Sequence, residues 1–317
     1  MGITINSPIM AVFILIAGVV LMIYSSKKAI DNSVVVASAF GIPPLIIGLV
    51  IISLGTDLPE IINSIMSSYL GHADINIGDS LGSVLSQLTL VFGVLPFFGG
   101  PIKLKRRELL VIGSCLVLAL IFLFTIFEKG SFTRLNALFM IASLGLFTVI
   151  TSASVAKEDF EIPKIPITAK QKWIHLLLVL FGLIGVGIGS SFVINSVITL
   201  AKNLRIPEYF ISFFLVGIGT SLPELFVDIT AIRSKQYNIA IGDILGSCLV
   251  DATLSIGIGQ FLFPQNISTS LANKTIIYLI ITAIIVISIL AVRKRLDRKM
   301  GILLIAIYLI SYLMLFF

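Results

Sequence analysis

The chain has 317 residues, of which 57% are hydrophobic and only 12% are charged, with a formal net charge of +6. The mean hydropathy is +1.12, whereas a water-soluble domain of this length needs many more charges to cover its surface. The composition therefore indicates one integral membrane domain surrounded by the lipid bilayer. Its basic residues lie in short loops, as the positive-inside rule requires, so we expect no nucleic-acid partner.

Ten apolar segments along the chain have lengths suited to membrane-spanning helices, which require roughly 20 residues. The longest hydrophilic stretch, residues 154–171, separates a first half (1–153) from a second half (172–317), each with five predicted helices. The predicted segments are residues 8–37, 42–70, 76–98, 107–127, 134–153, 172–202, 207–233, 240–262, 272–293 and 299–317.

Lys and Arg are distributed unevenly between alternate loops. About 17 of the 22 basic residues fall on one side of the predicted membrane, and about 5 fall on the other. Since basic loops are retained in the cytoplasm, the first side and the 154–171 linker should be cytoplasmic. We therefore predict a multi-pass protein of the cell membrane with both termini extracytoplasmic.

The two halves share an internal repeat. With Ile42 aligned to Ile206, an offset of 164 residues, residues 42–93 match residues 206–257 without a gap at roughly 20 of 52 positions. The matches include Pro, Glu, Asp, Thr, Ser and Gly, which apolar bias alone does not produce. Because each half has an odd number of helices, the second half must insert upside down. We predict an all-α membrane protein of two inverted five-helix repeats, an architecture of secondary transporters.

The first repeated motif is GTDLPE (residues 55–60), which is matched by GTSLPE (residues 219–224). Each proline lacks an N–H and interrupts its helix, so helices 2 and 7 should be broken. Carbonyls freed at membrane depth are tolerated where they line a cavity or meet an ion. Glu60 and Glu224 follow the breaks, and we expect no Lys or Arg in the core of any span to neutralise them. Carbonyls, hydroxyls and carboxylates together form a hard oxygen site suited to Ca²⁺ or Na⁺.

The second repeated motif is GDSLGS (residues 78–83) followed by Gln87, and its match is GDILGS (residues 242–247) followed by Asp251. Steps of four residues place the acidic, serine and final polar positions on one helix face. We therefore expect Ser83, Gln87, Ser247 and Asp251 to add oxygen ligands to the same site. The glycine pairs should let these helices approach their neighbours closely.

Three further carboxylates leave alternatives open. Asp79 and Asp243 lie near predicted helix starts, where an Asp commonly caps free N–H groups. A capping or packing role is one alternative for them, and a role in ion access is the other. Asp228 lies one turn after Glu224 and is a candidate for lining an aqueous route.

The paired GTxLPE motifs, each followed by IGDxLGS, resemble the α-repeats of the Ca²⁺/cation antiporter superfamily, most closely its prokaryotic Na⁺/Ca²⁺ exchanger branch. The resemblance implies a secondary antiporter, not an enzyme, that needs no cofactor and exchanges Ca²⁺ for Na⁺ by alternating access. It implies Ca²⁺ ligands at Glu60, Glu224 and the carbonyls of Thr56 and Thr220. The Na⁺ ligands that it implies are Ser83, Ser221, Ser247, Asp251 and the carbonyls of Ser53 and Gly217.

Two positions depart from the pattern of this superfamily. Asp57 stands where a serine is usual, and Gln87 stands where an asparagine is usual. Asp57 adds a carboxylate to a crowded acidic site, and like charges at low dielectric favour a bound proton. Exchange of Ca²⁺ or another divalent cation for H⁺ is therefore the alternative, although the GNxxE motif of the H⁺-coupled branch is absent.

Two other classes of protein also use paired carboxylates inside a membrane. A cation channel would use the same glutamates for selectivity, but broken helices in inverted halves favour a carrier. An intramembrane protease is disfavoured because the sequence has no HExxH motif and no GxGD motif with a partner YD.

Overall fold

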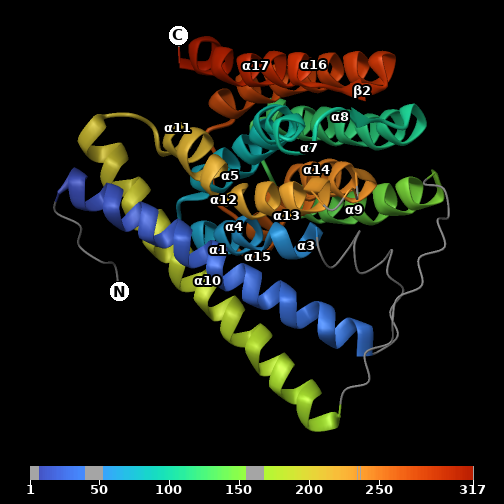
Figure 1. Ribbon diagram of the computed structural model, residues 1–317. Coiled ribbons are helices and arrows are strands. Elements are labelled where there is room, and N and C mark those ends of the chain that lie inside the picture. Colours follow the sequence, from blue (N-terminus) through green and yellow to red (C-terminus); the bar gives the residue numbers. More distant parts are fainter. Residues whose placement is uncertain (1–6, 40–52, 155–167, 234, 236, 317) are drawn as a thin grey trace.

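The computed structural model describes residues 7–39, 53–154, 168–233, 235 and 237–316 (Figure 1). Within these residues, nine helical segments are long and apolar enough to cross a membrane. The prediction of a helical membrane protein is thereby confirmed. The remaining predicted span, residues 42–70, is described only from Ser53 onward, so it lies partly outside the described residues.

The described helices of the first half agree with the predicted segments to within a few residues. The elements are α1 (Pro8–Ala39), α3 (Ser53–Thr56), α4 (Leu58–Tyr69), α5 (Ala73–Leu85), the π-helical turn η2 (Ser86–Val91), α6 (Phe92–Val94), α7 (Pro96–Gly99), β1 (Ile102–Lys103), α8 (Arg106–Glu128) and α9 (Arg134–Ser154).

The second half repeats this order of long and broken helices. Its elements are α10 (Ala169–Leu204), α11 (Glu208–Ile211), the π-helical turn η3 (Ser212–Val216), α12 (Gly217–Thr220), α13 (Leu222–Arg233), α14 (Tyr237–Val250), the π-helical turn η4 (Asp251–Ser255), α15 (Ile256–Leu262), α16 (Thr269–Arg293), β2 (Arg295–Leu296) and α17 (Arg298–Phe316).

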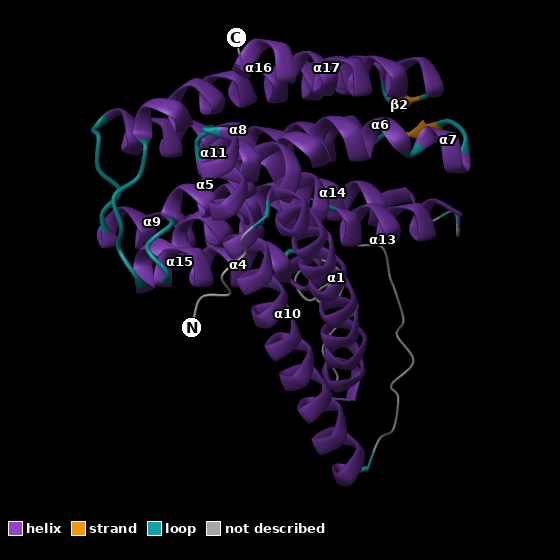
Figure 2. Ribbon diagram, turned by 90° about the vertical axis from the view of Figure 1, so that its left-hand side faces the viewer, coloured by secondary structure: helices purple, strands orange, loops and turns teal. Residues whose placement is uncertain are grey.

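Helices α1 and α10, here called the helix pair, pack along each other and project away from the other helices, here called the body (Figures 1 and 2). Their backbones approach closely, because a Cβ built on Gly18 would lie 2.9 Å from the Gly189 carbonyl oxygen. The apolar cluster of the helix pair includes Met22 and Val193 together with three residues of the body, whereas the larger cluster of the body contains no residue of either helix. The helix pair is therefore joined to the body only along part of its length.

The contacts between helices occur in matched sets. Helices at equivalent positions in the two halves contact each other, as α1 does with α10 and α8 with α16. The contact of α9 with α15 has its equivalent in the contact of α17 with α6. In the same way α4 on α10 is matched by α13 on α1, and α5 on α12 is matched by α14 on α3. Exchanging the two halves thus converts the first two contacts into themselves and each of the others into its matched contact.

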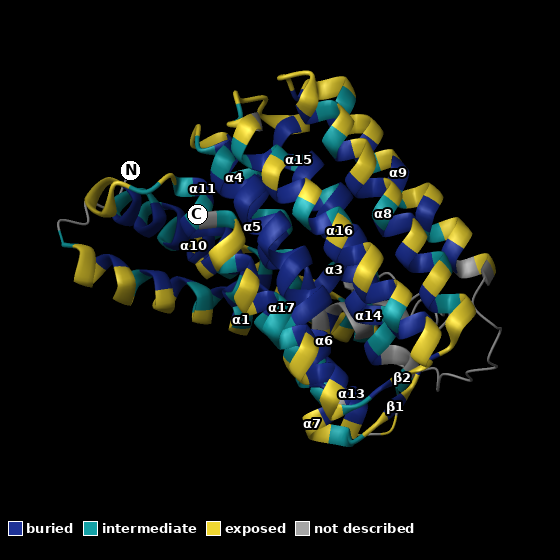
Figure 3. Ribbon diagram, turned by 90° about the horizontal axis from the view of Figure 1, so that it is seen from above, coloured by how far each residue is buried: buried dark blue, intermediate teal, exposed yellow. Residues whose placement is uncertain are grey.

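The burial pattern is that of a protein surrounded by lipid. Large apolar side chains point outward, with Leu135 exposed by 74%, Phe181 by 66% and Leu313 by 64%. At the centre, every residue of α5 except Asp74 is buried, although this helix contains Asn, Asp and Ser (Figure 3). Polar chemistry is therefore concentrated inside the helical body, around α5.

Helix α5 approaches the second half closely because of its glycines. A Cβ added at Gly78 would collide with the carbonyl oxygen of Tyr209, and one added at Gly82 would collide with that of Phe213. These two residues are the glycine pair of the second motif, so the predicted close packing is found in the first half. At Gly242, the repeat equivalent of Gly78, no described atom lies within 4 Å of an added Cβ.

A two-stranded ribbon, which the sequence analysis did not predict, connects the two halves at one end. Ile102 pairs with Leu296 and Lys103 with Arg295 in antiparallel register. Helix α17 then begins after Asp297, whose carboxylate accepts the Met300 N–H at 2.9 Å. That N–H, together with the Arg293 guanidinium, holds the pKa of Asp297 below its usual value. Strands of two residues are too short to produce an alternating pattern in the sequence.

The close approach at Gly78 generates a stability prediction. We expect Gly78→Ala to lower the free energy of unfolding by about 1–3 kcal/mol, because the added methyl group overpacks α5 against backbone that has no free space. Thermal unfolding of the purified protein in detergent measures the change. Gly242→Ala is the matched control and should be neutral or slightly stabilising, since alanine favours helices over glycine. Equal destabilisation by both variants would contradict this account.

Candidate cation site

The helices break at the same place in both motifs. α3 ends at Thr56 and α4 begins at Leu58, while α12 ends at Thr220 and α13 begins at Leu222. The intervening residues have nearly identical backbone angles, with φ −76° and ψ 3° at Asp57, and φ −79° and ψ 4° at Ser221. The prolines that follow occupy the second position of the next helix. An N–H group at that position has no acceptor within the helix, so a proline there costs no helical hydrogen bond. Both breaks were predicted from these prolines.

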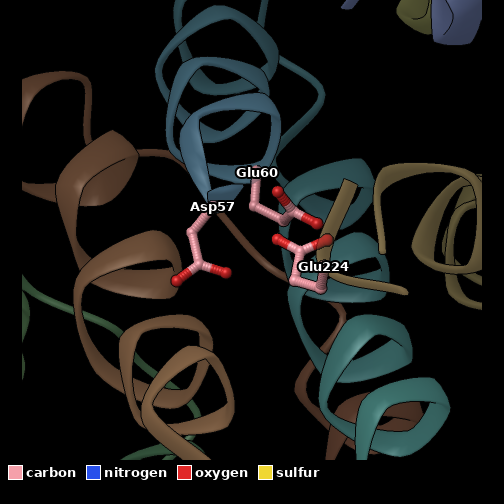
Figure 4. Close-up of side chains that lie close together, drawn as sticks. All are labelled: Asp57, Glu60 and Glu224. Carbon is pink, nitrogen blue, oxygen red and sulfur yellow. The ribbon is translucent and has the colours of Figure 1, made fainter. Parts of the chain in front are cut away.

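Three carboxylates converge at these breaks and form what we call the acidic centre. One carboxylate oxygen from each of Asp57, Glu60 and Glu224 lies within 4.8 Å of the others, and all three side chains are fully buried. Figure 4 shows Glu60 and Glu224 facing each other, with Asp57 beside them. Residues separated by more than 160 positions therefore meet in one buried cluster.

The charge of this cluster is not balanced by basic side chains. No Lys, Arg or His is buried in the part of the chain that the structure describes. Two ionised carboxylates 4.8 Å apart repel by about 3 kcal/mol at an effective dielectric constant of roughly 20. Protons or cations must therefore accompany the cluster in the membrane. The buried carboxylate side chains among the described residues are Asp57, Glu60, Asp79, Glu224, Asp228, Asp243 and Asp251.

Hydroxyl groups and one backbone carbonyl adjoin the acidic centre. Ser83 Oγ lies 3.3 Å from each of three oxygens, namely Glu60 Oε1, Thr220 Oγ1 and the Gly217 carbonyl. A single hydroxyl hydrogen satisfies only one such partner, and 3.3 Å is long for an O–H···O bond. The Ser83 hydroxyl is thus weakly bound to the protein, and its lone pairs remain available to a cation.

The Gly217 carbonyl is the centre of this group. It accepts the Ser221 hydroxyl at 2.7 Å and the Ser86 hydroxyl at 3.2 Å, and these two hydroxyls lie 2.9 Å apart. We call Ser83, Ser86, Thr220, Ser221 and the Gly217 carbonyl the hydroxyl cluster. Ser86 was missed from the sequence because valine replaces it in the other repeat. Its spacing of three residues from Ser83 places it on the same helix face, which was a usable signal.

Gln87 and Asp251, which occupy equivalent positions in the two repeats, contact each other. Gln87 Nε2 donates to Asp251 Oδ2 at 3.1 Å, and both side chains are fully buried. Both residues lie at the start of a π-helical turn, η2 or η4, a feature that is frequent at functional sites. Asp251 also lies near enough to Asp57 and Glu60 for their charges to interact. The amide of Gln87 is therefore engaged with a carboxylate next to the acidic centre.

The remaining predicted ligands are placed less completely. Thr56 and Ser247 are fully buried next to the breaks and the second motif. Ser53 begins α3, but its side chain lies outside the described residues.

Asp79 and Asp243 are not helix caps, so the capping role is wrong, while packing and ion access stay open. α5 begins at Ala73 and α14 begins at Tyr237, which places both aspartates well beyond the first turn. Asp79 instead accepts hydrogen bonds from Asn63 Nδ2 at 2.5 Å and from Thr220 Oγ1 at 3.0 Å. Predicted helix boundaries were a few residues late, and this placed both side chains too near the helix starts.

Asp228 extends the acidic region beyond Glu224. Its side chain is fully buried, and neither carboxylate oxygen accepts a hydrogen bond within the described part of the chain. It lies near enough to Asp243 and Glu224 for the charges to interact. A role in an aqueous route stays a prediction.

Comparison with known proteins identifies the class. The model of the sodium/calcium exchanger protein family matches the chain twice, over residues 10–153 and 174–317. The chain is 26% identical over 295 residues to the inner membrane protein YrbG of Escherichia coli, with 87% of each chain covered.

Solved structures of two exchangers are similar to the chain. The sodium-calcium exchanger NCX_Mj has a TM-score of 0.64 and 26% identity, and the match covers 96% of this chain and 98% of that one. The H⁺/Ca²⁺ exchanger CAX has a TM-score of 0.78 and 14% identity, and the match covers 96% and 82%. At that identity the second likeness shows the fold alone.

The fold and these relatives define a membrane cation exchanger, not an enzyme. The chain belongs to the sodium/calcium exchanger protein family. The resemblance that the two motifs indicated is thereby confirmed.

The geometry of the acidic centre generates a binding prediction. We expect Glu60→Gln and Glu224→Gln each to lower Ca²⁺ affinity by at least about tenfold, because each removes a charged ligand from a site that has few. Equilibrium binding of ⁴⁵Ca²⁺ to the purified protein is the measurement. Glu128→Gln, on an exposed side chain at the end of α8, is the control. Unchanged Ca²⁺ affinity in either buried variant would remove that residue from the site.

Proposed function

We propose that this protein is a secondary antiporter that exchanges Ca²⁺ for Na⁺ across the cell membrane by alternating access. The observation that carries the proposal is the buried acidic centre, in which Asp57, Glu60 and Glu224 meet while no base is buried among the described residues. A site that binds either a divalent cation or monovalent ions, but not both, couples their movements. Both ions are therefore substrates of the protein.

The proposed architecture is ten spans in two inverted repeats, residues 1–153 and 172–317, joined by a cytoplasmic linker at 154–171. The matched helix contacts support this arrangement, as do the equal backbone angles at Asp57 and Ser221. The contact between Gln87 and Asp251 also supports it, because equivalent residues meet at a two-fold axis. The distribution of Lys and Arg supports extracytoplasmic termini.

The two neighbouring oxygen groups suggest how the ions compete. Ca²⁺ suits the acidic centre, with Glu60 and Glu224 as charged ligands and the carbonyls of Thr56 and Thr220 completing the shell. Na⁺, with half the charge, suits the hydroxyl cluster, with Ser53, Ser247 and Asp251 as further ligands. Ser83 Oγ lies 3.3 Å from Glu60 Oε1, so Glu60 belongs to both groups. Occupation of one group by its ion therefore disfavours occupation of the other.

Proton coupling is the second candidate, and Asp57 is the observation that favours it. Both oxygens of this buried carboxylate lack a hydrogen-bond donor among the described residues. An ionised carboxylate without donors is costly in a low-dielectric interior, so a bound proton would stabilise it. On this alternative Asp57 carries H⁺ while Glu60 and Glu224 bind Ca²⁺.

Flux in proteoliposomes tests the proposed function. We expect ⁴⁵Ca²⁺ to accumulate in vesicles that contain the wild-type protein when an outward Na⁺ gradient is imposed. Without the gradient we expect no accumulation. The same vesicles with an imposed pH gradient and no Na⁺ test the second candidate. Ca²⁺ entry that needs neither counter-ion and does not saturate would instead indicate a channel.

Asp57 has its own prediction, because it separates the two coupling ions. We expect Asp57→Ser to preserve Na⁺-driven Ca²⁺ uptake to within about threefold, since Glu60 and Glu224 remain as charged ligands. Asp57→Asn, which removes the charge at nearly constant volume, should behave in the same way. Loss of pH-driven uptake in both variants, with Na⁺-driven uptake absent from the wild type, would establish H⁺ as the coupling ion. The exposed Asp31 provides the control variant Asp31→Ser.

A further inference from the structure

A continuous chain of hydrogen bonds runs from the helix pair into the hydroxyl cluster. Ser190 of α10 donates its hydroxyl to Asn63 Oδ1 of α4 at 3.0 Å, and Asn63 Nδ2 donates to Asp79 Oδ2 of α5 at 2.5 Å. The other oxygen of Asp79 accepts Thr220 Oγ1 of α12 at 3.0 Å. Thr220 lies 3.3 Å from Ser83, which in turn contacts Glu60. Four helices are connected by side chains that are all buried.

Asn63 is the branch point of this chain, because its amide contacts elements on both sides. Its oxygen is an acceptor for α10 and its nitrogen is a donor to α5, so the orientation of the amide is determined. The equivalent position in the other repeat is Val227, which cannot make either bond. The repeated fold therefore does not require an amide here, and the proposed cation ligands do not include Asn63.

Two neighbours of Asn63 on α4 make apolar contacts with the helix pair. Ile62 and Met66 of α4 pack against the apolar cluster of the helix pair. Apolar contact is non-directional and persists when one helix slides along another. A hydrogen bond is directional, and it is lost once the two atoms move beyond about 3.5 Å. The bond between Ser190 and Asn63 therefore depends on the position of α10 more steeply than these apolar contacts do.

Asp79 transmits this position to the cation ligands. By accepting the Thr220 hydroxyl hydrogen, Asp79 directs the lone pairs of Thr220 Oγ1 away from itself, and Ser83 lies 3.3 Å from that oxygen. If α10 moves and Ser190 is lost, the Asn63 amide is free to rotate and Asp79 loses a fixed donor. The Thr220 hydroxyl can then donate to the Val216 carbonyl, which lies 3.1 Å away, and the direction of its lone pairs changes. The oxygen atoms of the hydroxyl cluster are thus best oriented for a cation when α10 is in the observed position.

We propose that Asn63 is a positioning residue that couples the position of helix α10 to occupancy of the hydroxyl cluster, through Asp79 and Thr220. The inference rests on the proposed function in that the occupant is a transported cation. Since coupling between two sites is reciprocal, a cation that binds the oriented cluster also favours the observed position of α10 by the same factor. Asn63 and Ser190 would then lie outside the cation shell and still govern transport.

Distances measured between spin labels test the coupling directly. Nitroxide labels on Phe181→Cys of α10 and Leu118→Cys of α8, both lipid-exposed positions, report the place of α10 relative to the body. The native Cys115 and Cys248 are buried, which protects them from labelling. Full-length protein in lipid nanodiscs is measured in choline chloride and again in NaCl. We expect Na⁺ to shift the population of distances in the protein that carries only the labels.

Variants of the two bonded residues show whether the shift depends on their bond. We expect Ser190→Ala and Asn63→Ala each to reduce the Na⁺-induced change in the population ratio by about three- to tenfold, the usual worth of one hydrogen bond. The double variant should show no further reduction, because both changes remove the same bond. Ser191→Ala is the matched control, since its hydroxyl donates within α10 to the Gly187 carbonyl. Ser190→Thr retains the hydroxyl and should restore the shift.

Two results would overturn the proposal. One is a Na⁺-induced shift that persists unchanged in Ser190→Ala and Asn63→Ala, and the other is a pair of effects that simply add in the double variant. A thermal midpoint that falls in Ser190→Ala but recovers in Ser190→Thr, while the shift does not recover, would show a merely structural role. Wild-type ⁴⁵Ca²⁺ exchange is measured separately, so exchange without coupling contradicts this inference alone. Coupling without exchange contradicts the proposed function alone.

Discussion

The dominant constraint on this structure is the burial of carboxylates inside a membrane domain whose described residues include no buried base. Seven acidic side chains are buried in the described part of the chain, and three of them meet in the acidic centre. Such a cluster is stable in lipid only when cations or protons accompany it. The stability of the folded protein therefore depends on the occupancy of its site. A cation exchanger resolves it by always holding one of its substrates.

The backbone is shaped by the same constraint. The breaks at Asp57 and Ser221 bring two glutamates together, and the π-helical turns begin where Gln87 and Asp251 meet. Irregular backbone is tolerated at this depth because it is enclosed by protein and faces polar groups. The Gly217 carbonyl illustrates this, since it accepts one serine hydroxyl from η2 and one from the break at Ser221. The glycines of α5 allow those helices to come close enough for such contacts.

Pseudo-symmetry is incomplete where the chemistry is most specific. The two repeats share the glutamates, the breaks and the GS serines, but Asp57 corresponds to Ser221 and Gln87 corresponds to Asp251. Asn63 corresponds to Val227, so only one repeat ties the helix pair to its motif through an amide. An exchanger needs equal scaffolds to present its site to two sides in turn. On the proposed function, the unequal side chains are the candidates for distinguishing the two ions.

The sequence alone determined the helical class, the repeat, the positions of both breaks and most of the polar residues near the site. These features depend on local chemistry. A proline lacks an N–H in any fold, and the length of an apolar stretch can be read directly from the sequence. The tertiary structure decided which polar residues meet. It added Ser86 to the hydroxyl cluster, and it replaced a capping role for Asp79 with bonds to Asn63 and Thr220. Those contacts join residues up to 141 positions apart, and only the packing of helices brings such residues together.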